Sequence, residues 1–250
     1  MKNTNNVTAI ELSNIRSIGS NNLDINKFDF HIFNGNRPPL TYRNLNERAY
    51  EFWKTTWKKT YEIFTWNPDS LYSDQWSRQE NVGVLSYENE IVGTMFLTEV
   101  NIGTQMGRDD SILRMWSPGA LQTLLSCKPY NDTVLVFNWF TLNPEWRKSK
   151  LHNVDAKFIL CAMGLKFWEM SRIDILCGCP ITMSNVNKMC YEYGAHVVEK
   201  DVEESGVKVD LIYWDKNQHK IINYPRNSDI IESIWKNKFN NNRLPLNPAA

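Results

Sequence analysis

A basic turn follows the most apolar stretch of the chain. Residues 133–142 (TVLVFNWFTL) are almost continuously apolar, and Arg147, Lys148 and Lys150 come within the next few residues. A turn that leads from a strand into a helix directs several unpaired backbone N–H groups at one point, which is an anion site. The basic side chains add positive charge there. The pattern predicts that residues 147–152 bind a phosphate-bearing group, such as a pyrophosphate or a phosphopantetheine. The alternative is a basic capping loop with no ligand.

Other reactive residues form no recognised motif. Cys177 and Cys179 have C-x-C spacing, but no second cysteine pair or paired histidine accompanies them, so no zinc site is expected. The sequence has no HExxH pattern, no P-loop and no G-x-G-x-x-G motif. We therefore expect no metal and no prosthetic group, and neither nucleotide hydrolysis nor dinucleotide chemistry. The scattered histidines are His31, His152, His196 and His219.

The composition of the chain is electrically balanced. Its 250 residues include 28 lysines and arginines and 28 aspartates and glutamates, so the formal net charge is zero. No global field therefore recruits nucleic acid or an anionic membrane. The five cysteines are an odd number, which favours reduced thiols over a disulfide framework. Because the N-terminal residues have no apolar segment of the kind found in secretion signals, and no stretch of 18 apolar residues occurs, we expect a cytoplasmic protein.

The elements around the basic turn alternate between strand and helix. The continuously apolar strand at 133–142 is expected at the centre of a sheet. A helix is predicted over 154–170, and because it is apolar around much of its circumference it should pack on the sheet. A strand at 173–177 follows, and then a helix at 183–193 that ends at Gly194. This alternation predicts a partly parallel α/β sheet with helices on both faces.

Further elements flank this central unit. Apolar residues recur at spacings of three and four over residues 44–64, which predicts an amphipathic helix. The other predicted elements are strands at 28–33, 81–87, 91–97, 196–202 and 207–214, a helix that begins at Ser117-Pro118, a loop at 101–116 and a final helix at 229–239. We expect a flexible arm over residues 1–26, one domain over residues 27–220 and a helical extension over residues 221–250.

Three places in this order resemble the GNAT (GCN-related N-acetyltransferase) superfamily. Residues 91–93 (IVG), after a Glu-Asn-Glu turn, are similar to the second strand of the family's hairpin. Residues 142–147 (LNPEWR), before a long helix, are similar to its central strand and pyrophosphate loop. Residues 185–194, before an apolar strand, are similar to its last helix. The resemblance covers roughly Leu45 to Trp214, and the order of the three places carries it.

The resemblance implies a fold and an activity. The fold is α/β (α+β), with a mixed, mostly antiparallel sheet that has a central parallel split and helices on both faces. The activity is N-acyl transfer from a CoA or acyl carrier protein thioester to a small primary amine or amino acid, by direct attack in a ternary complex. The donor, acetyl-CoA, another acyl-CoA or an acyl carrier protein thioester, is a co-substrate. The residues implied in binding it are Phe140, Thr141, Leu142, Arg147, Lys148, Ser149, Lys150, Leu151, His152 and Asn185.

The chain departs from the family pattern in the basic turn. Two positions where the family has glycine or alanine fall on Lys150 and His152, whose side chains would crowd a pyrophosphate. Acyl-homoserine-lactone synthases and long-chain N-acyl amino acid synthases share this sheet and can accept an acyl carrier protein, whose acidic surface Lys148 and Lys150 would meet. The alternative from another class is a non-catalytic GNAT-like module that binds an acyl thioester or a protein partner.

The resemblance leaves the acid and the base open. The family often carries a glutamate on the central strand, and the aligned position here is Val136. Asn138, on the same strand face, is the nearest polar group and can orient a water or an amine. Glu99, near the end of the preceding strand, is the other candidate base. The family's general-acid tyrosine aligns with Cys190, so its neighbour Tyr191 is the predicted acid. The alternative is that Tyr191 only packs or hydrogen-bonds at a helix end.

Overall fold

The computed structural model of the chain describes residues 23–147, 154–218, 224 and 227–238. They form one seven-stranded sheet in the order β1-β2-β3-β4-β5-β7-β6. Every neighbouring pair is antiparallel except β4 and β5, which are parallel. This mixed, mostly antiparallel sheet with a central parallel pair is the predicted fold class, which is thereby confirmed.

The strands lie where the apolar patterns place them. They are β1 (Phe28–Phe33), β2 (Asn81–Tyr87), β3 (Glu90–Asn101), β4 (Thr133–Leu142), β5 (Ile175–Gly178), β6 (His196–Glu204) and β7 (Val207–Asp215). The hairpin between β2 and β3 turns at Glu88 and Asn89, whose φ angles are 47° and 71°. Positive φ at two consecutive residues gives a turn whose twist matches that of the flanking strands. β3 is longer than predicted, because it stays paired with β4 as far as Asn101.

The helices are of unequal length. They are α1 (Arg43–Ile63), α2 (Asp74–Ser77), α3 (Gln105–Arg108), α4 (Pro118–Ser126), α5 (Ala156–Met170), α6 (Val186–Glu192) and α7 (Ser228–Lys238). α4 begins as predicted, because the Ser117 hydroxyl accepts a hydrogen bond from the Ala120 N–H at 3.1 Å. Gly194 ends the α6 region with φ 81°, as predicted. The stretch predicted as a loop at 101–116 contains α3 and the single 3-10 turn η4 (Ser111–Leu113).

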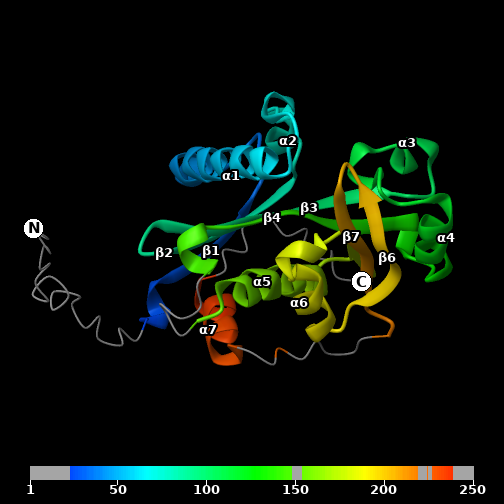
Figure 1. Cartoon of the computed structure of the whole chain (residues 1–250). Helices are drawn as coiled ribbons and strands as arrows, with labels where there is room; N and C mark the ends of the chain where they lie inside the picture. The colour runs from blue at the N-terminus through cyan, green and yellow to red at the C-terminus, as the bar shows by residue number, and fades with distance from the viewer. Residues whose placement is uncertain (1–22, 148–153, 219–223, 225–226, 239–250) are drawn as a thin grey trace, which may run out of the picture.

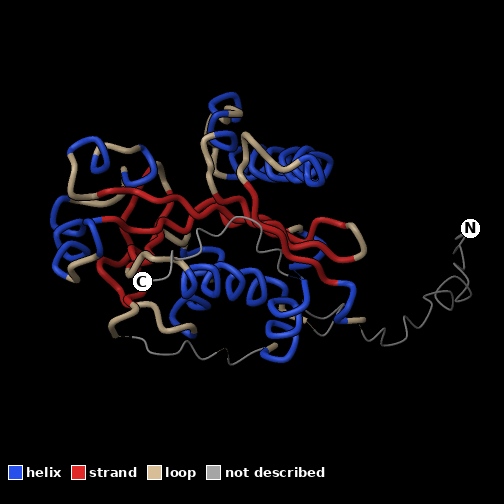
Figure 2. Tube along the Cα trace, turned by 180° about the vertical axis from the view of Figure 1, so that it is seen from behind, coloured by secondary structure: helices blue, strands red, loops and turns tan. Residues whose placement is uncertain are grey.

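Helices cover both faces of the sheet (Figure 1, Figure 2). On one face lie α5, α6 and α7, and on the opposite face lie α1 and α2. α3 and α4 lie near the end of the sheet that holds β6 and β7. α7 packs on β1 and α5, with Ile231 and Ile234 fully buried. The predicted C-terminal helix is thus part of the main core.

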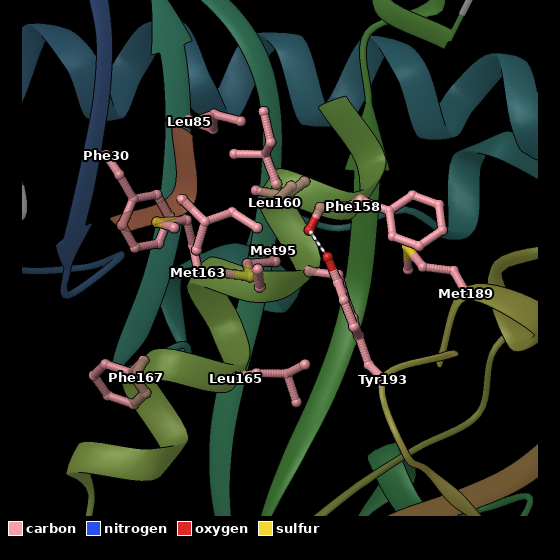
Figure 3. Close-up of a cluster of buried hydrophobic side chains, with 14 of the residues drawn as sticks. Phe30, Leu85, Met95, Phe158, Leu160, Met163, Leu165, Phe167, Met189 and Tyr193 are labelled. Atoms are coloured by element: carbon pink, nitrogen blue, oxygen red, sulfur yellow. Dashed lines mark hydrogen bonds between the residues drawn. The ribbon is translucent and has the colours of Figure 1, made fainter. Parts of the chain in front are cut away.

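One continuous core fills the α5 face, and we call it the α5-side core. It joins side chains of α5 to those of the strands, α6 and α7. Of the 15 residues of α5, 12 are buried, because the helix lies between the sheet and α7. Figure 3 shows part of this core, in which the Tyr193 hydroxyl donates a hydrogen bond to the Phe158 carbonyl oxygen at 3.1 Å. The apolar circumference predicted for this helix follows from that sandwiched position.

The opposite face holds two separate clusters. The α1-side cluster packs α1 and α2 on β1, β2 and β3, around Trp53 and Phe96. The α4-side cluster packs α4 and the η4 region on β4, β5 and β7, around Leu121 and Val209. Neighbouring β4 residues point to opposite faces, with Leu135 in the α5-side core and Val136 in the α4-side cluster. On this face the α1-side cluster therefore covers β1, β2 and β3, and the α4-side cluster covers the first half of β4 together with β5 and β7.

Candidate active site

The sheet separates in the middle of β4. β4 and β5 pair only from Val134 and Ile175 to Phe137 and Gly178. A Cβ at Gly178 would lie 2.9 Å from the Phe137 carbonyl oxygen, so glycine permits the last close approach of the two strands. Beyond that point β4 continues to Leu142 while β5 ends. Among the described residues, none pairs as a strand with residues 138–142 on their β5 side, so this stretch of β4 presents backbone polar groups to whatever lies there.

A β-bulge lies directly after this separation. Asn138 pairs with Phe96 and Thr141 pairs with Thr94, so Trp139 and Phe140 together oppose a single residue of β3. Trp139 has φ 50°, a left-handed conformation that a bulky residue seldom adopts. A bulge bends its strand and increases the local twist, which separates β4 further from β5.

Two hydrogen bonds hold the bulge in place. The Trp57 indole N–H donates to the Thr141 hydroxyl at 2.8 Å, and that hydroxyl donates to the Trp139 carbonyl oxygen at 2.7 Å. The Trp57 and Trp139 rings also contact each other edge to face, with centroids 4.8 Å apart. α1 is therefore linked directly to the irregular part of β4.

A cavity of about 380 Å³ occupies the separation. From the α5 face it is lined by Cys161, Met189, Cys190, Ile212 and Trp214. From the opposite face it is lined by Trp57, Tyr61, Trp66, Ser111, Ile112 and Met115. Because its walls come from both faces, the cavity crosses the sheet where β4 and β5 part. Its volume lies within the range of small-ligand sites, about 300–1,000 Å³.

Few charged groups reach this cavity. Asp74 is the single carboxylate among its described lining residues, and Arg78 and Arg114 are the cations. The Arg78 guanidinium contacts an Asp110 carboxylate oxygen at 3.1 Å and donates to the Ser111 hydroxyl at 3.4 Å. Arg78 thereby joins α2 to the η4 region across the margin of the cavity.

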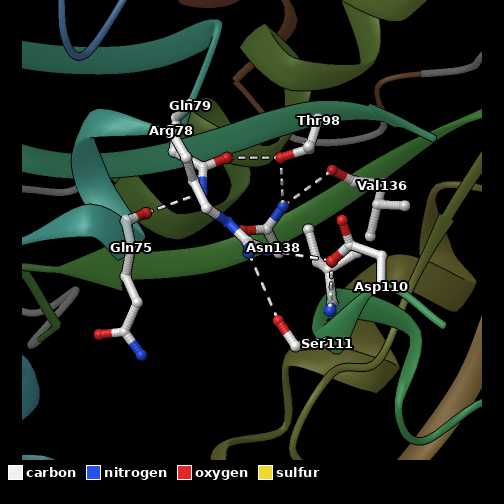
Figure 4. A network of polar contacts seen from close by, with 9 residues as sticks. Gln75, Arg78, Gln79, Thr98, Asp110, Ser111, Val136 and Asn138 are labelled. Carbon is white, nitrogen blue, oxygen red and sulfur yellow. Dashed lines mark hydrogen bonds and ion pairs between the residues drawn. The ribbon is translucent and has the colours of Figure 1, made fainter. Parts of the chain in front are cut away.

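Asn138, predicted as a catalytic residue, is among the residues that line the cavity, and Figure 4 shows its hydrogen bonds. Its side-chain N–H groups donate to the Thr98 hydroxyl and to the Val136 carbonyl oxygen, both at 3.1 Å. Thr98 in turn donates to the side-chain carbonyl of Gln79 at 2.5 Å. The Asn138 side-chain oxygen is buried and has no hydrogen-bond partner among the residues that the structure describes. A polar atom of this kind is an acceptor available to a ligand.

Glu99, the other predicted base, lies elsewhere on β3. It is exposed, pairs with Leu135 in the sheet, and is not among the residues that line the cavity. Partial desolvation and the nearby Glu80 carboxylate raise the pKa of Glu99. Its role as a base stays a prediction.

Tyr191, the predicted acid, is bound to β7. Its hydroxyl donates to an Asp210 carboxylate oxygen, which also accepts a hydrogen bond from Asn187 at 2.8 Å. Burial, together with the hydrogen bond to Asp210, raises the pKa of Tyr191. Tyr191 is not among the cavity-lining residues, whereas its neighbour Cys190 is. Its role as the acid therefore also stays a prediction.

The cavity wall on the α5 face carries a pair of thiols. Cys161 of α5 and Cys190 of α6 are neighbours that both line the cavity, and all five cysteines of the chain are free. Burial and the neighbouring Cys190 thiol raise the pKa of Cys161 well above its ordinary value. Cys161 is thus a protonated, weakly nucleophilic thiol.

The predicted donor-binding residues are distributed along and beyond β4. Phe140 lines the cavity, whereas Thr141 and Leu142 are buried beside the bulge. The Arg147 side chain donates through Nε to the Leu142 carbonyl oxygen at 3.1 Å, and partial desolvation lowers the pKa of Arg147. Asn185 has φ 54° and precedes α6 between two cavity-lining residues. The other five, Lys148, Ser149, Lys150, Leu151 and His152, lie outside the described residues.

Sequence reasoning did not single out the residues that line the cavity from the α1 side of the sheet. Trp57 and Tyr61 belong to an apolar helical stripe, which predicts core packing. Trp66, Arg78 and Arg114 lie in irregular segments with no motif. Their approach to β4 depends on contacts between distant parts of the chain, and no local signal marks it.

No protein-family model matches the sequence, and no curated protein matches it. Solved structures do match. A CoA-dependent acyl-homoserine lactone synthase, BjaI, is 10% identical, with a TM-score of 0.52 over 85% of this chain and 92% of its own. FeeM, an N-acyl amino acid synthase from uncultured soil microbes, is 13% identical, with a TM-score of 0.46 over 74% and 88%. A probable acetyltransferase from Staphylococcus epidermidis is 11% identical, with a TM-score of 0.46 over 75% and 98%.

At these identities the likeness shows the fold. The chain has the GNAT-type fold that the order of its sequence elements predicted. No described helix is both long enough and apolar enough to cross a membrane. The described residues also contain no group of three or more His, Cys, Asp or Glu side chains that could hold a metal ion. The cytoplasmic location stays a prediction.

Proposed function

We propose that this chain is an N-acyltransferase that moves an acyl group from a CoA or acyl carrier protein thioester to a small primary amine. The observation that carries the proposal is the cavity that crosses the sheet where β4 and β5 separate. A thioester on one side of the sheet and an amine on the other can meet there without a covalent enzyme intermediate. Holding both reactants in one site converts their encounter into a unimolecular step.

The donor is proposed to lie along the unpaired edge of β4. A pantetheine arm carries amide groups, and residues 138–142 offer it backbone partners on the side where β5 has ended. Arg147, beside the end of β4, is placed to meet a phosphate of the donor. The structurally similar BjaI is CoA-dependent and was solved with isopentyl-CoA, which supports a CoA thioester as the first donor to test.

The reaction needs an uncharged amine. Its nitrogen lone pair attacks the thioester carbonyl carbon, the C–N bond forms and the C–S bond breaks. The nitrogen loses one proton and the departing thiolate gains one, so the products are an amide and a free thiol. Backbone N–H groups near Phe140 are candidates to stabilise the oxyanion, because this edge of β4 has no strand partner. Asn138 can orient the amine but cannot accept its proton. Cys190, which lines the cavity, and Tyr191, as predicted, are the candidate proton donors to the thiolate.

The acceptor is proposed to enter from the α1 face. Aromatic side chains of α1 and the following loop, Trp57, Tyr61 and Trp66, form its wall. Arg78 and Arg114 supply positive charge at the same wall, and Asp74 supplies one negative charge. An acceptor that carries an anionic group besides its amine, such as an amino acid, fits this set of charges.

A specific observation favours a non-catalytic binding module as the second candidate. Neither Glu99 nor Tyr191 lines the cavity, and the Tyr191 hydroxyl is already bonded to Asp210. A protein that only binds an acyl thioester needs the cavity and the β4 edge but no acid or base. The two functions differ in whether thiol is released when an amine is added.

Two measurements test the proposal. Thermal unfolding is followed with CoA, a series of acyl-CoA thioesters and an acyl carrier protein thioester. At 100 times its dissociation constant a true donor adds about 2.7 kcal/mol to the stability of the folded state. Free thiol is then measured across a panel of amines and amino acids. Stabilisation without thiol release identifies the binding module, and the absence of both with every donor overturns the proposed function.

A further inference from the structure

A chain of hydrogen bonds connects a buried glutamine to Asn138 in the cavity wall (Figure 4). Gln79 is only 1% exposed, and its side-chain N–H donates to the Gln75 backbone carbonyl at 2.7 Å. A backbone carbonyl accepts but never donates, so this contact identifies the nitrogen end of the Gln79 amide. The oxygen end must then face the Thr98 hydroxyl, from which it accepts at 2.5 Å.

The direction of this chain continues to Asn138. The Thr98 hydroxyl donates its only proton to Gln79, so it can only accept a hydrogen bond from Asn138. One N–H of the Asn138 side chain donates to the Thr98 hydroxyl at 3.1 Å, and the other donates to the Val136 backbone carbonyl oxygen at 3.1 Å. A rotated Asn138 amide would direct its oxygen at two acceptors. The network therefore admits one orientation of this amide.

In that orientation the Asn138 carbonyl oxygen is buried and has no hydrogen-bond partner within the described part of the chain. An unpaired buried acceptor costs stability, and such atoms are expected where a ligand completes the bond. Asn138 belongs to the cavity wall at the point where β4 and β5 part. The location and the missing partner together indicate a hydrogen-bond donor on a bound molecule.

We propose that Gln79 and Thr98 are positioning residues that hold the Asn138 amide with its oxygen toward an N–H of the acceptor amine. This inference rests on the proposed function. A primary amine has two N–H groups and one lone pair, so one N–H bonded to Asn138 leaves the lone pair for the thioester carbon. The bond strengthens as the nitrogen gains positive charge during attack, which favours the transition state over the bound amine.

The network holds no titratable group. Gln79, Thr98 and Asn138 stay neutral at every pH at which the protein is folded. The loss of the relay therefore lowers the rate equally at all pH values, and the shape of the pH profile stays that of the wild type. A residue that exchanged protons would change that shape.

The kinetic test compares substitutions along the relay. Thr98→Val keeps the shape of the side chain and removes the hydroxyl, and we expect kcat/KM for the amine to fall about tenfold, with the donor KM unchanged. Thr98→Ser should keep most of the wild-type kcat/KM, because serine supplies the same hydroxyl. Gln79→Met breaks the relay and behaves like Thr98→Val, whereas Gln79→Glu keeps an acceptor and loses less. Asn138→Leu removes the oriented oxygen and costs about a hundredfold.

A double-mutant cycle separates positioning from packing. If Thr98 acts through Asn138, Thr98→Val adds nothing to Asn138→Leu, and the double variant has the activity of Asn138→Leu alone. The matched control is Thr133→Val. Thr133 begins β4, its hydroxyl donates to the Asn131 carbonyl oxygen at 3.2 Å, and it is not among the residues that line the cavity, so the loss of its hydroxyl should leave kcat/KM unaltered. Additive losses in the cycle, or an equal loss in the control, overturn the inference.

A second measurement needs no turnover. The side-chain NH₂ signals of Asn138, assigned in ¹⁵N-asparagine-labelled protein by their absence in Asn138→Leu, report both of its donated bonds. We expect slow hydrogen exchange at both protons, and Thr98→Val should shift and expose one of them. Unchanged signals in Thr98→Val overturn the relay itself. If the signals respond as expected but wild-type protein transfers no acyl group to any amine, the proposed function fails, and the catalytic role of the relay fails with it.

Discussion

The two faces of the sheet are built differently. On the α5 face the apolar side chains form one continuous core, and α5 buries nearly its whole circumference. On the opposite face, the α1-side and α4-side clusters stand apart, and the cavity lies between them over the irregular end of β4. The first arrangement maximises buried apolar area, which is the main favourable term in folding. The second leaves apolar area uncovered around the cavity, whose other wall is the edge of the α5-side core. The difference indicates that the α5 face supplies most of the stability and one wall of the binding site, whereas the opposite face supplies the rest of the site.

The same contrast appears within β4. Up to Phe137 the strand is paired on both sides, and beyond it the β5 side is open. The paired half contributes Leu135 to the α5-side core, and the open half contributes Asn138 and Phe140 to the cavity. Substitutions in the core beneath the paired half should therefore act mainly on stability. Substitutions in the open half should act on ligand binding, and on stability as well where the side chain is buried, as at Thr141.

The largest expected effect breaks the continuous core. Leu160→Ala removes a fully buried side chain from α5, and we expect the free energy of unfolding to fall by about 2–5 kcal/mol. Met115→Ala, a half-buried side chain at the cavity wall, should cost less than about 1 kcal/mol, because its outer part already faces empty space. Urea unfolding measures both. Equal losses would show that the two faces contribute alike to stability.

The next effect concerns the bulge that opens the sheet. Thr141→Val leaves the Trp57 N–H and the Trp139 carbonyl without their hydroxyl partner. Because Thr141 is buried, we expect a loss of about 2 kcal/mol and a higher KM for the donor. Thr133→Val, at the other end of β4, removes only a bond to the Asn131 carbonyl and is the control. A normal donor KM in Thr141→Val would show that the bulge does not shape the donor site.

A smaller effect tests the basic turn. Arg147→Ala should weaken donor binding about tenfold, through the loss of one charge-assisted contact, without unfolding the protein. Titration calorimetry with CoA measures the affinity. Arg172→Ala is the matched control, because Arg172 is exposed just beyond the opposite end of α5. An unchanged affinity in Arg147→Ala would show that this arginine is not part of the anion site.

The smallest expected effect depends on pH and concerns the hydrogen bonds that join α6 to Asp210 of β7. Burial alone would raise the pKa of Asp210, but hydrogen bonds from Tyr191, the Asp201 N–H and Asn187 outweigh it, and the pKa is lowered. A lowered folded-state pKa adds stability that is present above the ordinary aspartate pKa, about 3.9, and is lost as the pH falls through the folded value. Unfolding midpoints measured from pH 6 to pH 3 should fall less in Asp210→Asn than in the wild type. Parallel curves would contradict the assignment.

Much of the fold could be predicted from local patterns. The continuous apolar run at 133–142 predicted a central strand, the Glu88-Asn89 turn predicted the hairpin, and Ser117-Pro118 predicted the start of α4. These signals work because periodicity, turn conformation and helix capping depend on residues a few positions apart. The order of the elements then predicted the mixed sheet and its parallel pair.

The candidate site could be predicted only in part. Asn138 was expected to orient an amine, and it lines the cavity. Residue type and position in the sequence indicated Glu99 and Tyr191. The surroundings of their side chains depend on residues from other strands, which the spacing of residues in the sequence does not predict. Tyr191 meets Asp210 across 19 positions of the chain. Most of the other cavity-lining residues, such as Trp57 and Trp214, belong to no sequence motif.

Local patterns in the sequence predicted which segments become strands and helices, which of them are buried, and the GNAT-type fold that they form. Contacts between distant parts of the chain set where β4 leaves β5, how the bulge at Trp139 forms, and which way the Asn138 amide points. The physical reason is sequence separation. Thr98 and Asn138 are 40 residues apart, and Trp57 and Thr141 are 84 apart. Contacts of that range form only when the whole sheet and its helices are assembled.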